Sequence, residues 1–195
     1  MSANGAQSSA RTESCSTETR AVDFWQVMEA RQSVRAFDQQ RDVPPEAVTR
    51  LLHAAIRAPS AGNCQPWHFF VVRDQKTRKA LARAALNQWF LSEAPVVIVV
   101  CADPERSARR YGDRGRYLYS LQDTAASTEN LLLAAVASGL GACWVGAFDE
   151  DAAAEALDLS SHLRPVAIIP VGYPAERPRQ QTDRLTLDSV VKAIH

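Results

Sequence analysis

The apolar run at residues 94–102 restricts the fold more than any other feature of the sequence. Every residue in it except Pro95 is Ala, Val, Ile or Cys, and its length is about half the ~20 residues that a membrane-spanning helix requires. A strand that is apolar at every position has no side to turn toward water. Pro95–Ala102 is therefore predicted to be a buried β-strand.

Helices and strands are predicted to alternate around this strand, and no segment of the sequence repeats. Further strands are predicted at residues 67–72, 142–145 and 165–171, and helices at 23–31, 44–59, 74–87, 118–139, 150–157 and from about 187. This alternation predicts a central sheet sandwiched between helical layers. The pattern does not give the directions of the strands.

Two neighbouring segments carry opposite expectations. Residues 103–117 contain five arginines and two glycines, which favours a solvated loop or lid over a packed element. Residues 118–139 are predicted to form a long helix whose second half, residues 131–137, is apolar on every side. That helix should be enclosed on several sides by its own chain or by a partner's.

Length and composition predict one folded domain. The chain has 195 residues, of which 46% are hydrophobic, which is enough for one sizeable core and short for two. Residues 1–20 are polar, mixed in charge and without periodicity, so they are predicted to form a flexible extension. Residues 21–195 then form the single domain.

Charge and composition exclude several classes of partner and site. The 22 basic and 22 acidic residues give a formal net charge of zero, so no overall field attracts nucleic acid or an anionic membrane. The first 20 residues contain no apolar stretch of the kind that a secretory signal needs, which predicts a cytoplasmic protein. The four cysteines and four histidines lack the spacing of a metal site, so no metal is expected.

Well-known nucleotide-binding and catalytic motifs do not match the residues present. In GLGACW at 139–144, tryptophan stands where a dinucleotide-binding fingerprint needs its third glycine. Residues 141–148 have the glycine spacing of a phosphate loop but not its lysine. Ser60 and Ser138 are not in the setting of a hydrolase nucleophile, and no neighbour would activate the Cys64 thiol. Covalent catalysis is therefore not predicted.

Three separated clusters remain, and the first is rich in arginine. In Arg31-Gln32-Ser33-Val34-Arg35, residues i, i+2 and i+4 face one way if the chain is extended. Two guanidinium groups and a hydroxyl then converge, which suits a phosphate because arginine offers a planar fork of donors. Two surface arginines after a helix are also commonplace, so this cluster does not establish a site by itself.

The second and third clusters are loops. Residues 59–67, PSAGNCQPW, hold the polar side chains of Ser60, Asn63 and Gln65 in a loop fixed by two prolines and a glycine. These donors and acceptors could read the polar edge of a flat heterocycle. Residues 139–148, GLGACWVGAF, include small residues that let backbone N–H groups approach a ligand and hydrogen-bond a ring nitrogen.

In this order and at these separations, the clusters resemble the nitroreductase family of FMN-dependent oxidoreductases. The likeness covers about residues 24–195 and rests on RQSVRAF (31–37), PSAGNCQPWHF (59–69), Gln122-Asp123 with Glu129-Asn130-Leu131-Leu132 on the long helix, GLGACWVGAF (139–148) and VGYPAERP (171–178). The resemblance implies an α+β fold, a three-layer α/β/α sandwich with a central mixed sheet. It further implies an intertwined homodimer that dimerises through its long helices and holds each FMN in a crevice contributed by both chains.

The resemblance also implies which residues hold the FMN phosphate and ribityl chain. Mapped onto this sequence, they are Arg31, Ser33 and Arg35, helped by Arg184 in the C-terminal arm. Arg35 is alternatively placed at the pyrimidine edge. Gln32 stands where a second basic residue is often found, so the arginines on either side of it must supply more of the positive charge.

Around the flavin ring, the resemblance implies contacts from both chains. The partner's loop would contribute Pro59, Ser60, Asn63 and, as a weaker candidate, Gln65. The same chain's backbone would line the ring near N5 at Val145, Gly146 and Ala147. Larger members of the family carry Glu-Gly at the last two of these positions, so no particular N–H is assigned to N5.

The implied activity is hydride transfer from NADH or NADPH, through FMN, to a small organic acceptor such as a nitroaromatic or quinone by a ping-pong mechanism. No catalytic acid or base is expected, because the cofactor carries the chemistry. Three alternatives stay open: a relative that fragments a flavin or dehalogenates an aromatic, a flavin-binding sensor without turnover, and an oligomeric scaffold with solvated clusters. Candidates for a substrate cover are Trp89, Phe90, Tyr111, Tyr117 and Tyr119, although core packing is favoured for each.

Overall fold

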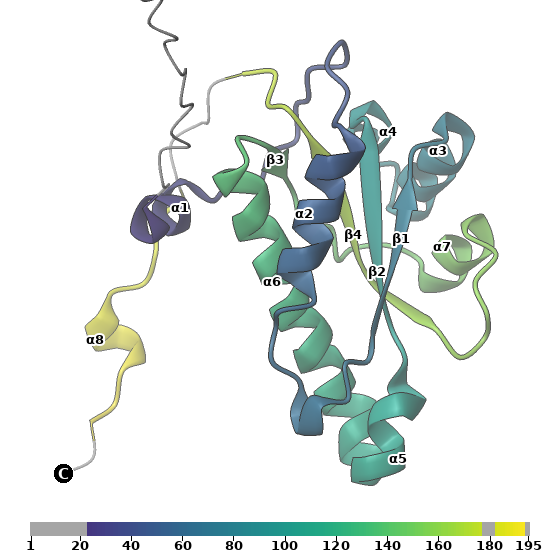
Figure 1. Ribbon diagram of the computed structural model, residues 1–195, viewed down its shortest axis with the longest axis vertical. Helices are drawn as coiled ribbons and strands as arrows, with labels where there is room; N and C mark the ends of the chain where they lie inside the picture. The colour runs from purple at the N-terminus through teal and green to yellow at the C-terminus, as the bar shows by residue number, and fades with distance from the viewer. Residues whose placement is uncertain (1–22, 177–181, 194–195) are drawn as a thin grey trace, which may run out of the picture.

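The computed structural model describes residues 23–176 and 182–193. The predicted extension at residues 1–20 and residues 177–181 of the C-terminal arm lie outside this part. In chain order (Figure 1) the elements are α1 (Phe24–Ala30), α2 (Pro45–Ala55), η1 (Ala61–Asn63), β1 (Trp67–Val72), α3 (Gln75–Ala84), α4 (Phe90–Glu93), β2 (Val96–Ala102), α5 (Pro104–Arg114), η2 (Gly115–Tyr119), α6 (Ser120–Ala137), β3 (Gly141–Ala142), α7 (Glu150–Ala156), β4 (Arg164–Gly172) and α8 (Leu187–Val190).

The sheet has four strands in the order β1-β2-β4-β3, and each neighbouring pair is antiparallel. A parallel pairing occurs at the sheet edge, in the isolated bridge between Ser33 and Ala142. The apolar run forms β2, next to the centre of the sheet, and all of its residues are buried. The prediction of a buried strand is confirmed.

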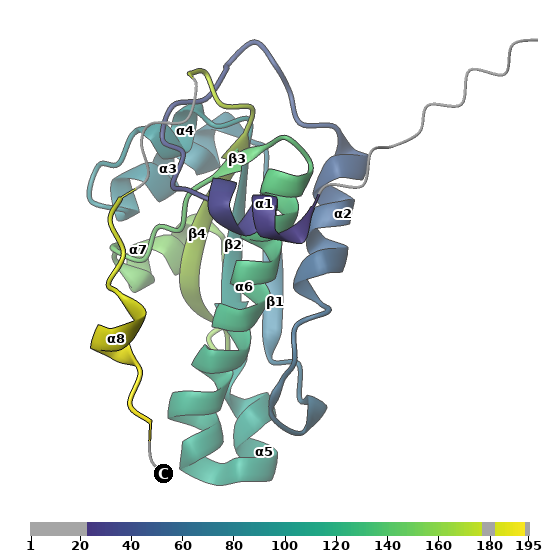
Figure 2. The same cartoon turned by 90° about the vertical axis from the view of Figure 1, so that its left-hand side faces the viewer.

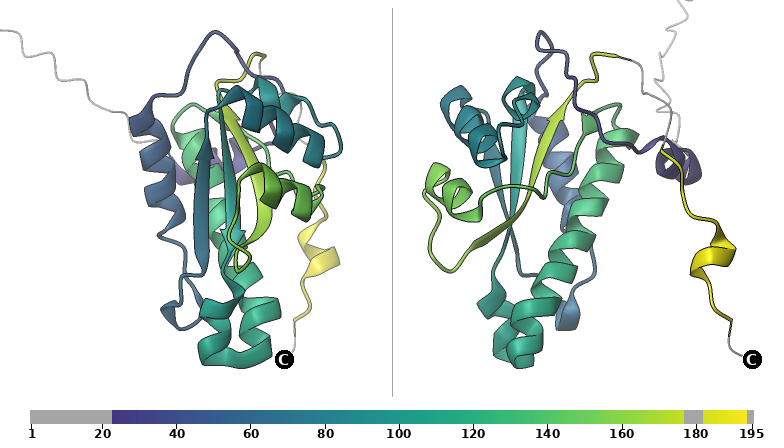
Figure 3. Two further views of the ribbon diagram at one scale, coloured as in Figure 1. Left: turned by 90° about the vertical axis from the view of Figure 1, so that its right-hand side faces the viewer. Right: turned by 180° about the vertical axis from the view of Figure 1, so that it is seen from behind.

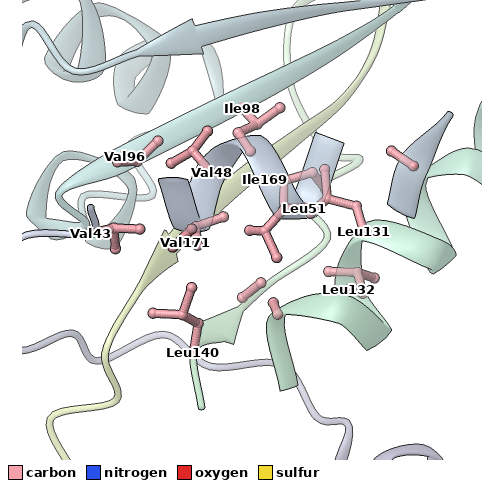
Figure 4. Close-up of a cluster of buried hydrophobic side chains, with 14 of the residues drawn as sticks. Val43, Val48, Leu51, Val96, Ile98, Leu131, Leu132, Leu140, Ile169 and Val171 are labelled. Atoms are coloured by element: carbon pink, nitrogen blue, oxygen red, sulfur yellow. The ribbon is translucent and has the colours of Figure 1, made fainter. Parts of the chain in front are cut away.

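Helices cover both faces of the sheet (Figures 1 and 3). Val96, Ile98 and Val100 of β2 pack in one core with α2 and α6, while the alternate residues 97, 99 and 101 pack in a second core with α3 and α7. Figure 4 shows the first core, where side chains from the two helices meet those of the sheet. The three-layer α+β fold implied by the sequence is therefore confirmed.

Aspartates begin several of the helices by accepting a backbone N–H one turn into the helix. Asp74 does so for the basic helix α3, and Asp149 for α7. Gly139, with φ of +69°, follows the end of the long helix α6, where the left-handed backbone suits a residue without a side chain.

The prediction of a solvated loop at residues 103–117 is wrong, because this segment is helical. Asp103 caps α5 by accepting the Arg106 N–H, Pro104 occupies the first turn, and η2 then joins α5 to α6 with π-helical geometry. Ser107 and Gly115 are buried where α5 meets η2, and most of the arginines lie on the exposed side. Arginine-rich composition concealed an ordinary pair of helix-start signals.

Two apolar surfaces remain exposed at the side of the molecule beyond α6. The ring of Trp25 on α1 is 70% exposed, and Phe24 and Met28 beside it are also exposed. Figures 1 and 3 show α8 standing clear of the layers, and the side chains of Leu185 and Leu187 are more than three-quarters exposed. Among the described residues, none of the helices combines the length and apolar character needed to cross a bilayer.

Candidate functional site

The arginine segment lies against β3 at the edge of the sheet. It leaves α1 at Arg31 and forms the parallel bridge between Ser33 and Ala142. The N–H of Val34 donates to the Ala142 carbonyl at 2.9 Å. This pairing brings the first predicted cluster beside the third.

Gly141 allows this close approach. A Cβ atom on Gly141 would lie 2.8 Å from both Cγ atoms of Val34, which is shorter than a normal carbon–carbon contact. Val34 and Gln32 line an apolar hollow of about 190 Å³. Because side chains alternate along an extended segment, Gln32 points away from Ser33.

The electrostatics at Cys143 indicate that the other side chains of the segment gather there. Burial raises the pKa of the Cys143 thiol, and three effects oppose it: the charge of Arg35, a hydrogen bond from Ser33 and the charge of Arg31. Arg31, Ser33 and Arg35 therefore all lie near enough to Cys143 to act on its thiol. Ser33 and Arg35 are exposed beside it.

Each arginine also has a second neighbour. Arg31 lies 4.0 Å from the carboxylate of Glu129 on α6, measured from Nε to Oε1. The Arg35 guanidinium lies 6.0 Å from the ring centre of Phe90 on α4. These weak contacts leave the donors of both guanidinium groups available to an anion.

The three residues expected to face flavin N5 differ in whether their backbone N–H groups are already hydrogen-bonded. Val145 is buried and exchanges two hydrogen bonds with Ile168 of β4, each 3.0 Å long, so its N–H is already occupied. Gly146 and Ala147 are exposed, and within the described part of the chain their N–H groups have no hydrogen-bond partner. Of the three, only the last two can offer an N–H to a ligand.

Gln88, which the sequence analysis did not single out, holds this segment from behind. Its side-chain amide donates to the Ala147 carbonyl at 3.2 Å and to the Ala85 carbonyl at 2.9 Å. The connection between α3 and α4 is thereby tied to the segment that carries the two free N–H groups. A polar residue between apolar Leu91 and Ala85 was the signal available in the sequence.

The second cluster folds into a compact turn around η1. The Gln65 N–H donates to the Ser60 hydroxyl oxygen at 3.0 Å, and the Gln65 side chain donates to the Asn63 amide oxygen at 3.1 Å. Gly62, Asn63 and Gln65 have φ of 54°, 56° and 50°, in the left-handed region. Pro59 precedes the turn and is exposed.

This turn lies far from the other two clusters in the same chain. It is attached to Asp123 near the start of α6, whereas β3 follows the other end of that helix (Figures 1 and 2). The 14 residue steps from Asp123 to Ala137 correspond to ~21 Å of helix. One chain therefore carries two separate groups of candidate residues, or candidate partial sites, one at each end of α6.

Arg184 is not brought to either partial site by contacts in this chain. Among the described residues, its guanidinium donates to Thr182 and to the Asp183 carbonyl. It is exposed on the C-terminal arm that leads to α8.

The aromatic candidates for a cover divide into two groups. Tyr111 and Tyr119 pack edge to face, 5.2 Å between ring centres, on the α5–η2 unit. Trp89 is 46% exposed next to Phe90, and Tyr117 is 68% exposed on η2. The first pair is used in packing, while the exposed rings are free to meet a ligand or a second chain.

The described residues contain no group of three or more His, Cys, Asp or Glu side chains that could hold a metal ion. The polar groups that do converge are cationic, hydroxyl or backbone N–H donors. Such a set suits an anionic or carbonyl-rich organic ligand.

Comparisons with known proteins identify the family of this chain. The model of the Nitroreductase family matches residues 28–93 and 85–173. A protein of Archaeoglobus fulgidus named "Putative NADH dehydrogenase/NAD(P)H nitroreductase" is 38% identical over 152 residues, covering 75% of this chain and 82% of its own length. The "FMN reductase (NADPH)" of Bacillus subtilis is 27% identical over 156 residues, covering 73% of this chain and 62% of its own.

Solved structures also resemble this chain in fold. A crystal structure described as "Putative NADH Oxidase" from Clostridium acetobutylicum superposes with a TM-score of 0.74 and 32% sequence identity, covering 87% of this chain and 99% of that one. The matched regions include the arginine segment, the turn around η1 and the loop after β3. The chain belongs to the Nitroreductase family and is an oxidoreductase.

Proposed function

We propose that this chain binds FMN between two copies of itself and transfers hydride from NADH or NADPH to a small organic acceptor such as a nitroaromatic or a quinone. One observation supports the proposal above the others. Arg31, Ser33 and Arg35 lie near Cys143, and a few residues later the N–H groups of Gly146 and Ala147 have no hydrogen-bond partner among the described residues. A phosphate at one end and a ring nitrogen at the other are the acceptors that this set of donors matches.

The residues present fit FMN at its phosphate end. Guanidinium forks and a hydroxyl form charge-assisted hydrogen bonds with phosphate oxygens. Arg31, Ser33 and Arg35 offer these groups, and in the described part of the chain no short ion pair competes for them, since the Glu129 contact of Arg31 measures 4.0 Å. Arg184 would add a further guanidinium from the C-terminal arm.

At the ring end, the backbone would orient the flavin. The N–H groups of Gly146 and Ala147 would donate to ring acceptors near N5, and Gln88 would keep their segment in place through the Ala147 carbonyl. When bound, FMN would supply the hydride chemistry that links the nicotinamide to the acceptor. The protein's part would then be to bind and orient the ring and to exclude water, which is consistent with the lack of an acid–base pair among the clusters.

The separation of the two partial sites supports a homodimer. Within one chain, the turn at residues 60–65 and the arginine segment lie at opposite ends of α6, so neither is complete. A second copy related by two-fold symmetry would set its turn beside the first chain's arginines. The exposed apolar side chains of α1 and α8, and the half-buried Leu133 and Val136 on α6, would lie between the copies.

The proposal is tested with the purified protein. We expect a yellow protein with flavin absorbance near ~450 nm, or a colourless one that regains this absorbance with added FMN. It should oxidise NADH or NADPH with a nitroaromatic or quinone faster than with either nicotinamide alone under air. A protein that stays colourless and does not bind FMN would overturn the proposal, and an oligomeric scaffold would remain as the alternative function.

Substitutions assign the phosphate contact. Arg35→Ala and Arg31→Ala should each raise the FMN dissociation constant about tenfold or more, as expected for losing a hydrogen bond to a charged group. Arg50→Ala is the matched control, since Arg50 is exposed on α2 and makes no side-chain contact within the described residues. Full flavin occupancy in both of the first two variants would refute the assignment.

Two outcomes would favour a different function. A protein that binds FMN but whose flavin is not bleached by NADH or NADPH would be a flavin-binding sensor without turnover. If bleaching occurs but nitroaromatics and quinones do not restore the colour, a dehalogenating or flavin-fragmenting activity is favoured.

A further inference from the structure

We propose that Asp123, Arg106 and Arg110 are positioning residues that hold the turn at residues 60–65 in the conformation needed to meet the partner's flavin. This inference rests on the proposed function. Arg106 and Arg110 lie on α5, outside the segments that carry the family resemblance, and Asp123 lies on α6 within one of them. Each of the three makes a hydrogen bond to the backbone of the turn.

The turn requires support because its backbone is strained. Asn63 and Gln65 have φ of 56° and 50°, in a region that costs energy for residues with a Cβ atom. Such a conformation persists only where the surroundings impose it. The turn's internal hydrogen bonds involve exposed atoms that compete with water.

Asp123 supports the start of the turn from the buried side. Both of its carboxylate oxygens lie within hydrogen-bond distance of the Ala61 N–H, at 3.1 and 3.2 Å. The residue is only 7% exposed, and within the described part of the chain no cation faces it. Burial raises the pKa of Asp123, while the hydrogen bond from Ala61 lowers it.

A buried carboxylate with a single N–H donor contributes little to the free energy of unfolding. Its desolvation is not offset by an opposite charge, so an apolar residue there would serve the fold as well or better. Its specific contribution is geometric, because it fixes the direction of the Ala61 N–H. This places Asp123 with the site and not with the core of α6.

The two arginines of α5 hold the rest of the turn. Arg110 donates to the Gly62 carbonyl at 2.9 Å, and Arg106 donates to the Gln65 carbonyl at 2.9 Å. A Cβ atom on Gly62 would lie 2.8 Å from the Arg110 Nη1 atom and would also collide with the Tyr111 hydroxyl. Helix α5 therefore covers the turn closely, and its arginines contact both ends of the strained stretch.

Once the backbone is fixed, the polar side chains have defined roles. The Ser60 oxygen accepts from the Gln65 N–H, and the Asn63 oxygen accepts from the Gln65 side chain. What remains for a ligand is the Ser60 hydroxyl hydrogen and the Asn63 amide hydrogens. The turn is thus set to donate hydrogen bonds, which matches the carbonyl oxygens of a flavin's pyrimidine ring.

The test compares Arg110→Ala, Arg106→Ala and Asp123→Ala with Arg109→Ala in the full-length dimer. Arg109 is the control because it is exposed on α5 and has no side-chain partner among the described residues. Two measurements are made: the FMN dissociation constant, and the hydrogen-exchange rates of the amides of residues 61–65 in the FMN-free protein. Exchange reports the turn without reference to flavin.

In Arg110→Ala and Asp123→Ala we expect faster exchange at residues 61–65 and an FMN dissociation constant raised about ten- to hundredfold. Arg109→Ala should match the wild type in both measurements. Asp123→Asn keeps a carbonyl oxygen for the Ala61 N–H, so it should restore most of the FMN affinity. Should Asp123→Ala fail to fold, the exposed arginine variants carry the same comparison.

The outcomes separate this inference from the proposed function. Wild-type protein that binds no FMN would refute the proposed function, while exchange would still report whether the three residues hold the turn. Wild-type binding with unchanged exchange and affinity in the variants would overturn the inference alone. Faster exchange with unchanged FMN affinity would also overturn it, because the turn would then be held for a purpose other than flavin.

Discussion

Replacing Gly141 by alanine should separate the arginine segment from β3. The new Cβ would lie 2.8 Å from both Cγ atoms of Val34 and 2.9 Å from its Cβ, whereas carbon atoms pack at about 3.5–4.0 Å. Val34 cannot turn aside easily, since its β-branched side chain has few rotamers and its N–H is bonded to the Ala142 carbonyl at 2.9 Å. The segment must therefore move as a whole.

The magnitude follows from two opposing effects. Overpacking costs ~2 kcal/mol at the middle of its usual range. Replacing a glycine by alanine returns ~0.7 kcal/mol by restricting the unfolded chain. The net loss of ~1.3 kcal/mol should appear in the free energy of unfolding of the FMN-free protein. If the segment shifts to relieve the clash, FMN affinity should fall about tenfold as well.

Urea unfolding and an FMN fluorescence titration measure the two effects. Gly146→Ala is the control for stability, because a Cβ there would have the Trp144 ring nitrogen at 3.8 Å as its nearest neighbour. Val34→Ala removes two of the three clashing atoms, so the double variant should lose ~1 kcal/mol less than the sum of the single variants. Strict additivity, or an unchanged Gly141→Ala protein, would refute the steric reasoning.

Two further predictions follow from titrating groups. Iodoacetamide at pH 8 should modify half-exposed Cys64 in the native protein but not Cys101. Burial raises the pKa of Cys101 to about 12, so only about one thiol in ten thousand is ionised at this pH. Peptide mass spectrometry measures the labelling, and labelling of Cys101 in the native protein would contradict the burial of β2. A hydrogen bond from Arg164 lowers the pKa of Glu150, so this pair stabilises the fold above the ordinary pKa of glutamate and loses its effect as pH falls through the folded value. Glu150→Gln should therefore cost less than ~1 kcal/mol at pH 7, and the cost should shrink as the pH falls through the lowered pKa of Glu150; a cost that grows on acidification would reverse the sign of this interpretation.

Much of the fold could be predicted because local sequence and burial agree. The strands β1 and β2 begin and end within one position of the predicted residues. Apolar or aromatic runs of this length form buried strands in a layered fold. The error at residues 103–117 has a clear cause. Five arginines suggested solvent exposure, but exposure and helical structure are compatible, and Asp103 followed by Pro104 already marked a helix start.

The site was harder to predict because its segments are held together by backbone hydrogen bonds, which do not depend on side-chain identity. Nothing in the letters of residues 31–35 shows that Ser33 pairs with Ala142, or that Val145 is committed to β4. Asp123 belongs to a motif that carries the family resemblance, but the sequence does not show that it accepts the Ala61 N–H. Arg106 and Arg110 escaped notice because exposed polar residues have no periodicity to reveal them, and half-buried Gln88 was overlooked among the residues between α3 and α4.

Subunit mixing offers a direct test of whether two chains build each site. The double variant Arg31→Ala/Arg35→Ala and the double variant Ser60→Ala/Asn63→Ala should each bind FMN poorly as homodimers, because every site lacks one half. In a mixed dimer, one of the two sites receives its arginines from one chain and its intact turn from the other, so that site is wild type. Coexpression with two affinity tags isolates the mixed dimer, which should bind about one FMN per two chains with near wild-type affinity. If both clusters acted within one chain, each chain of the mixed dimer would keep its own defect and no affinity would return.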